Sequence, residues 1–132
     1  MKKLVLLIMI LMMAVFASVY ADEFMTKKAG NYTIMAHFEK DPPVKGENKL
    51  IIAIKDKAGQ PVEDAKVTVK YYVVAERQST QKPYTEYNTD AKAAGSEYRA
   101  ILNLTMKGPW YIETKFVRGG KEEWATVHFH VK

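Results

Sequence analysis

The sequence predicts an all-β protein, an immunoglobulin-like antiparallel β-sandwich of about seven strands. Apolar and polar residues alternate with a period of two through most of the chain after residue 21, as in strands that bury one face. Turn segments rich in Gly, Pro, Asn and Asp recur between these runs. No segment after residue 21 carries a sustained helical period, so we expect no helical layer.

The first half of the chain contains three predicted strands. The first covers 31–39 and ends at "DPPVKGEN", because consecutive prolines cannot donate to a ladder. The second covers 48–56. The third covers 65–76, a run rich in β-branched and aromatic residues that follows the turn segment "KAGQPVED".

The second half begins with its least hydrophobic part, 77–95, which predicts a long connection with one edge strand near Thr85 to Lys92. Further strands are predicted over 96–104, 110–119 and 121–132. The Gly-Gly pair before the last strand is a hairpin signal.

Two aromatic residues are assigned to the core. Tyr98, three residues after Gly95, is predicted to be a buried tyrosine whose hydroxyl bonds nearby backbone. Trp110 follows a Gly-Pro turn and is predicted to be a core aromatic.

The N-terminus differs in character from the rest. Lys2 and Lys3 precede the apolar run "LVLLIMILMMAVFA", and Ala21 ends a small-residue cleavage pattern. We predict a signal peptide over 1–21, a short lead over 22–30 and a single domain over 31–132, located in the periplasm or secreted. An uncleaved N-terminal membrane anchor is the alternative, although the run falls short of the roughly 20 residues a spanning helix needs. Cleavage would leave no inserted segment.

Composition excludes several functional classes. Removing residues 1–21 takes two lysines and no acidic residue from totals of 20 basic and 15 acidic residues, which leaves a net charge of +3. No basic run is interleaved with aromatic residues, so nucleic-acid binding is not expected. The absence of cysteine excludes disulfides, thiolate metal sites and a cysteine nucleophile. Ser79 and Ser96 lie in turn-like contexts without an evident base, so we do not expect an enzyme.

A metal site is suggested by "HFH" in the last strand. Residues two apart in a strand lie about 6.5 to 7 Å apart on one side, so His128 and His130 could approach one ion. His37 and Met35 share a face of the first strand, and would join them if that strand ran beside the last one. One thioether and three imidazoles would suit copper. The alternative is polar decoration of a solvated face.

A second candidate site is a surface for a protein partner of the bacterial envelope. The polar segment 77–87 carries Arg77, Tyr84 and Tyr87, a side-chain set that suits protein contacts. A sheet edge is another possible contact surface. Ordinary edge packing of the tyrosines is the alternative.

Three blocks, "DPPVKGENKLIIAIKDKAGQPVEDAKVTV", "GSEYRAILNLTMKGPWYIETKF" and "ATVHFHV", resemble the YtkA-like or FixH-like domain family of exported bacterial proteins. The resemblance covers roughly residues 31 to 131. The matching positions are Pro43, Gly46, Asn48, Asp56, Gly59, Pro61, Val62, Ala65, Val67, Gly108 and Trp110.

The resemblance implies a small immunoglobulin-like sandwich linked with copper handling, respiratory-oxidase assembly or heavy-metal efflux. Many members carry a Met-Pro-rich loop after the third strand, whereas the corresponding "VVAERQSTQKPY" has no methionine. We therefore expect an exported, non-enzymatic accessory or binding protein, with copper as the candidate cofactor. The alternative is a protein-interaction module without a metal role.

Overall fold

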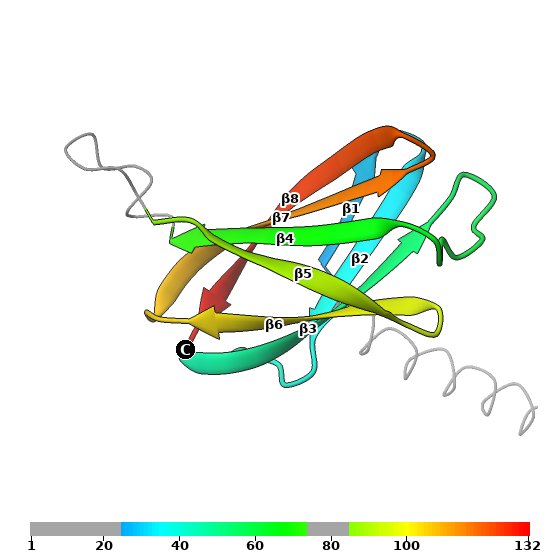
Figure 1. Ribbon diagram of the computed structural model, residues 1–132. Coiled ribbons are helices and arrows are strands. Elements are labelled where there is room, and N and C mark those ends of the chain that lie inside the picture. Colours follow the sequence, from blue (N-terminus) through cyan, green and yellow to red (C-terminus); the bar gives the residue numbers. More distant parts are fainter. Residues whose placement is uncertain (1–24, 74–84) are drawn as a thin grey trace, which may run out of the picture.

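The computed structural model describes residues 25–73 and 85–132, which form eight strands (Figure 1). Within these residues no helix has the length and hydrophobicity needed to span a membrane. The all-β antiparallel fold predicted from the sequence is confirmed. The strands are β1 (Met25–Ala29), β2 (Tyr32–Phe38), β3 (Gly46–Lys55), β4 (Lys66–Val73), β5 (Tyr87–Ala94), β6 (Glu97–Leu104), β7 (Gly108–Arg118) and β8 (Lys121–Val131).

The strands form two layers that share β5. The order is β1-β2-β3-β6-β5-β4-β7-β8, and every pair is antiparallel. Residues 87–91 of β5 pair with β4, and residues 92–94 pair with β6, so β5 crosses from one layer to the other (Figure 1). Strands β1 and β8, at the two ends of this order, lie side by side without being neighbours in the ladder. We call this junction the β1/β8 seam.

Two strands differ from the expectation. Strand β1 lies inside the segment 22–30 that was predicted to be a lead, and its central residues 26–28 are all exposed. Strand β5 was expected at a sheet edge but is flanked by β4 and β6. Both strands are mostly exposed, and each contributes few side chains to the core. Apolar alternation is therefore weak in both, and it indicated neither the presence of β1 nor the central place of β5.

The core fills the space between the two layers, and it follows the period-two pattern. In β2, for example, Ile34, Ala36 and Phe38 are buried, while the residues between them are half-buried on the outer face. Close packing of these inward side chains accounts for the pairing register of the sheet, because a slip of one residue would expose them all. The largest fully buried side chains are Trp110, Tyr98, Phe116, Leu50, Ile52, Ile54, Leu102, Leu104, Ile112, Val62, Val69 and Val131.

Tyr98 fastens the β3–β4 connection to the core. Its buried hydroxyl donates to the carbonyl oxygen of Val62 at 2.8 Å and accepts from the backbone N–H of Ala65 at 3.1 Å. Tyr98 is buried and its hydroxyl bonds backbone groups, as predicted, although these partners lie 33 and 36 residues earlier in the chain. Because both partners are backbone groups of one connection, a single side chain fixes its path across the end of the sandwich.

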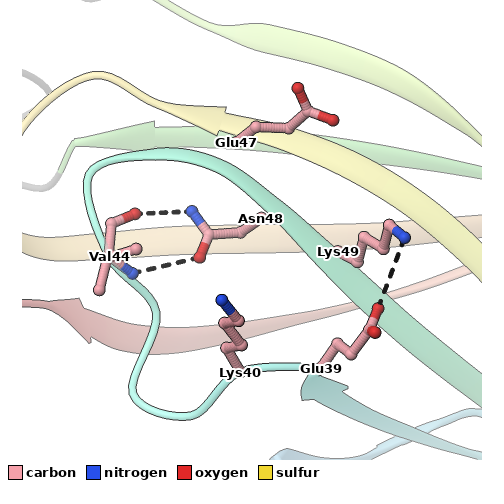
Figure 2. Close-up of a pocket in the computed structure, with 6 residues that line it drawn as sticks. All are labelled: Glu39, Lys40, Val44, Glu47, Asn48 and Lys49. Carbon is pink, nitrogen blue, oxygen red and sulfur yellow. Dashed lines mark hydrogen bonds and ion pairs between the residues drawn. The ribbon is translucent and has the colours of Figure 1, made fainter.

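The β2–β3 loop is held by a buried amide (Figure 2). The Oδ1 atom of Asn48 accepts from the Val44 N–H at 3.1 Å, and its Nδ2 donates to the carbonyl oxygens of Val44 and Gly46 at 2.6 and 3.0 Å. The same loop accepts a hydrogen bond from the Lys132 N–H at the carbonyl oxygen of Pro43 (3.3 Å). The loop therefore lies against the C-terminal end of β8.

Replacing Tyr98 by Phe removes the hydroxyl and leaves two backbone groups without their partner. We expect the free energy of unfolding to fall by roughly 1–3 kcal/mol, the usual effect of stranding buried polar groups. Urea unfolding followed by fluorescence measures this change. Tyr111→Phe, on the half-buried outer face of β7, is the matched control and should change stability by less than about 0.5 kcal/mol. Equal losses in the two variants would contradict the role assigned to Tyr98.

Replacing Asn48 by Ala removes all three hydrogen bonds that shape the loop. We expect a loss of roughly 1–3 kcal/mol and faster amide hydrogen exchange at Val44 and Lys132. Asn103→Ala, at an exposed position of β6, is the control and should leave both amides unchanged. Unaltered exchange in the Asn48 variant would show that the loop is held by other contacts.

Candidate functional site

His128 and His130 lie near the end of β8, and both side chains are exposed. In the β7–β8 ladder His128 is opposite Tyr111 and His130 is opposite Pro109. The His128 ring lies against the Tyr111 ring, with centroids 5.0 Å apart, and Tyr111 contacts Tyr72 of β4 at 5.4 Å. This row of rings across the outer face limits where the His128 imidazole can lie.

Both histidines line a surface hollow of about 310 Å³ at the β1/β8 seam. The hollow combines side chains of three separate segments: the first residue of β1, the β2–β3 loop with the end of β2, and the end of β8. It is lined by Met25, Phe38, Asp41, Pro42, Pro43, His128, Phe129, His130 and Lys132.

Contacts between β2, β8 and the β2–β3 loop frame the hollow. The rings of Phe38 and Phe129 meet with centroids 4.9 Å apart and join β2 to β8 beneath it. The hydrogen bond from Lys132 to this loop closes the C-terminal side. The two imidazoles are therefore carried by a fixed frame although their own side chains face solvent.

The lining of this hollow contains several groups that can bind a metal ion. It offers two imidazoles, one thioether (Met25), one carboxylate (Asp41) and one ammonium group (Lys132). Imidazole and thioether donors suit copper, whereas hard cations prefer several oxygens. In the part of the chain that the structure describes, no three or more His, Cys, Asp or Glu side chains are grouped so as to hold a metal ion by themselves. A metal at this hollow would thus need the thioether or an outside ligand.

His37 and Met35 are placed elsewhere. Both lie on β2, where His37 is opposite Ile51 and Met35 is opposite Thr26 of β1. The expectation that the strand carrying His37 runs beside the last strand is wrong, because β1 occupies that place. The structure brings His128 and His130 together at one hollow, which β2 reaches through Phe38, whereas Met35 and His37 are not among the residues that line it. The reason is the extra N-terminal strand that the sequence did not reveal.

The predicted partner surface is only partly described. Arg77 and Tyr84 lie outside the described residues. Tyr87 is half-buried in β5 and stacks on Tyr71 with centroids 5.2 Å apart, and it also contacts Trp110 at 6.0 Å. Its ring is thus part of the packing at one end of the sandwich.

A second hollow, of about 240 Å³, lies beside the β2–β3 loop (Figure 2). Its charged groups have both signs, and Glu39 and Lys49 form an ion pair of 3.9 Å between largely exposed side chains. Such exposed pairs stabilise little. Elsewhere on the surface the pKa of Arg118 is raised, chiefly by hydrogen bonding with Tyr32 and further by Asp64. Its Nε donates to Asp64 Oδ1 at 2.9 Å, which links β7 to the β3–β4 connection.

Sequence reasoning missed Met25 and Asp41 as neighbours of the histidines. One signal was present: Gly30-Asn31 is a two-residue hairpin pair of the kind that joins antiparallel strands. Residues 25–29 and 32–36 do pair across it. That hairpin would have placed a strand before the first predicted one. The proximity of Asp41, by contrast, depends on a loop path that the sequence does not encode locally.

Comparison with known proteins agrees with this architecture. The YtkA-like family model matches residues 26–115. The crystal structure of the PmoD soluble domain from Methylocystis sp. ATCC 49242 (Rockwell) is similar, with a TM-score of 0.51 and 16% sequence identity over 82% of this chain and 97% of that one. At this identity the similarity concerns the fold alone. No curated protein sequence matches the chain significantly. The family match spans most of the molecule, from β1 into β7, and the chain therefore belongs to the YtkA-like family.

Proposed function

We propose that this protein is an exported, non-enzymatic accessory protein of the bacterial envelope that binds copper through His128 and His130. The observation that carries the proposal is that both imidazoles line one hollow at the β1/β8 seam. They belong to alternate residues of β8. The ring of Tyr111, on the neighbouring strand β7, lies against the His128 ring. Alternate positions on one strand place both imidazoles on the same side, which reduces the ordering needed for them to meet one ion.

The donors at the hollow suit copper, because a thioether lies beside two imidazoles. The chain has no cysteine, so thiolate zinc or iron–sulfur sites are not available to it. Among the described residues the hollow contributes a single carboxylate, whereas calcium and magnesium sites use several oxygen ligands. The family resemblance, which implies copper or heavy-metal handling, favours the same kind of metal ion.

Binding without catalysis agrees with the exposure of both histidines. A catalytic metal site holds its ion by several fixed ligands with a supporting second shell. Here the imidazoles are open to solvent, so an ion can be taken up and passed on. Ser96 lies exposed in the β5–β6 turn, and Ser79 is outside the described residues.

Export rests on the sequence of residues 1–21, which also lie outside the described residues. Cleavage after Ala21 would leave Met25 close to the new N-terminus, and the hollow with it. We place the protein in the periplasm or outside the cell on that basis.

Titration of the exported protein with Cu(I), Cu(II) and Zn(II) tests the proposal. We expect one equivalent of Cu(I) to shift the imidazole resonances of His128 and His130, because their nitrogens become ligands. NMR of the side chains measures this directly. Unchanged His128 and His130 signals at stoichiometric metal would remove the metal function.

Two variants accompany that titration. His128→Gln combined with His130→Gln should weaken Cu(I) binding by at least about tenfold, since even the loss of a supporting group commonly has that effect. His37→Gln, on β2, is the matched control and should retain the affinity. Equal weakening in both variants would locate the ion away from the seam.

Protein binding at a sheet edge is a second candidate function. Trp124 on the outer face of β8 is 57% exposed, and Trp is the residue type most often dominant in protein interfaces. It lies opposite Lys115 of β7 on the same edge of the sandwich as the seam. A partner from the envelope could use this edge.

Recovery of a partner from periplasmic extract, before and after Trp124→Ala, tests the second function. We expect the wild type and the His128→Gln/His130→Gln variant to recover the same protein and Trp124→Ala to lose it. Thermal unfolding of each variant verifies that the fold is intact. Equal recovery by all three would exclude this edge as the contact.

A further inference from the structure

Met25 is the first residue of β1 and lines the same hollow as His128 and His130. It is half-buried, and its Cα is paired with that of Ala36 in the β1–β2 ladder. It supplies the thioether of that hollow. The two proposed copper ligands, His128 and His130, both belong to β8, on one side of the seam.

The two ends of β1 meet β8 differently. At the far end the β1–β2 turn packs so closely that a Cβ on Gly30 would lie 2.8 Å from the Oε1 atom of Glu123. At the near end Met25 faces the hollow between β1 and the histidines. Strands β1 and β8 therefore run in opposite directions along the seam, with close contact at one end and an open space lined by donors at the other.

The donors on the two sides of this space are complementary. The thioether of Met25 is a soft ligand that favours Cu(I), and imidazole is a good ligand for copper in general. Cu(II) and Zn(II) gain less from a thioether than Cu(I) does. A site of this composition should therefore discriminate in favour of the monovalent ion.

We propose that Met25 is a third ligand, so that Cu(I) bound to His128 and His130 fastens the N-terminal strand β1 to β8 across the seam. This inference rests on the proposed copper function. It adds that the ion links β1 and β8, which no hydrogen-bond ladder joins. Ion binding is then coupled to the docking of β1 against β8. Because a ligand that binds the closed form alone stabilises it, β1 should open less often with Cu(I) present.

A purely structural role for Met25 makes a different prediction, because Met25 also packs against the edge of the core. Met25→Leu keeps the volume and the apolar contact but removes the sulfur. Packing alone would leave metal affinity unchanged in this variant. Coordination would weaken Cu(I) binding by at least about tenfold, with little change for Zn(II).

The experiment uses the exported protein with methyl-labelled methionine, titrated with Cu(I) and with Ag(I) as a redox-inert substitute. We expect the Met25 methyl resonance to shift together with His128 and His130, while Met35 and Met106 stay in place. Amide exchange in β1 should slow on metal addition in the wild type and not in Met25→Leu. Met35→Leu is the matched control and should behave as the wild type.

The outcomes separate the two proposals. Shifts at His128 and His130 with an unmoved Met25 methyl and an unaltered Met25→Leu affinity would overturn the third ligand and leave the copper function intact. No shift at any histidine would overturn both. A shift of Met25 with slower exchange in β1, both lost in Met25→Leu, would establish the link across the seam.

Discussion

Strand β5 pairs with β4 along its first part and with β6 along its last part, and the rest of the architecture depends on this crossing. It joins the two layers by hydrogen bonds on one side, so that the sandwich has no open edge there. Among the described strands, the hydrogen-bonded order is then interrupted at one place, between its two terminal strands β1 and β8. Every candidate ligand at the hollow is found at that junction because β5 has closed the other side.

The seam is held by side chains and loops in place of a ladder. Phe38 and Phe129 join the layers under it, and the last residue of the chain bonds to the loop that Asn48 shapes. Strand β1 has five residues against eleven in β8, so it covers part of the β8 edge at most. An edge that is incompletely covered has backbone groups facing solvent, which makes it the natural place for a ligand or a partner.

The sequence was sufficient where burial imposes a period of two. The inward faces of β2 and β6, and the buried hydroxyl of Tyr98, follow from alternation and from a recognised turn device. It did not predict β1, and it predicted β5 as a strand but placed it at a sheet edge; the side chains of both strands are mostly exposed. The error over His37 followed from the first omission: with β1 missing, β2 was assigned its position. Residues from three segments meet at the hollow, and local patterns do not encode such meetings.

The two histidines of the seam are not equivalent, and the difference bears on how an ion would be held. The His128 ring rests on Tyr111, which itself contacts the buried Tyr72, so part of its rotational freedom is already lost before any ligand arrives. His130 is opposite Pro109, and no ring contact is found for it among the described residues. Binding through a pre-ordered ligand loses less conformational entropy than binding through an unrestrained one. For the proposed copper site, His128 is therefore the imidazole that loses less conformational entropy on binding.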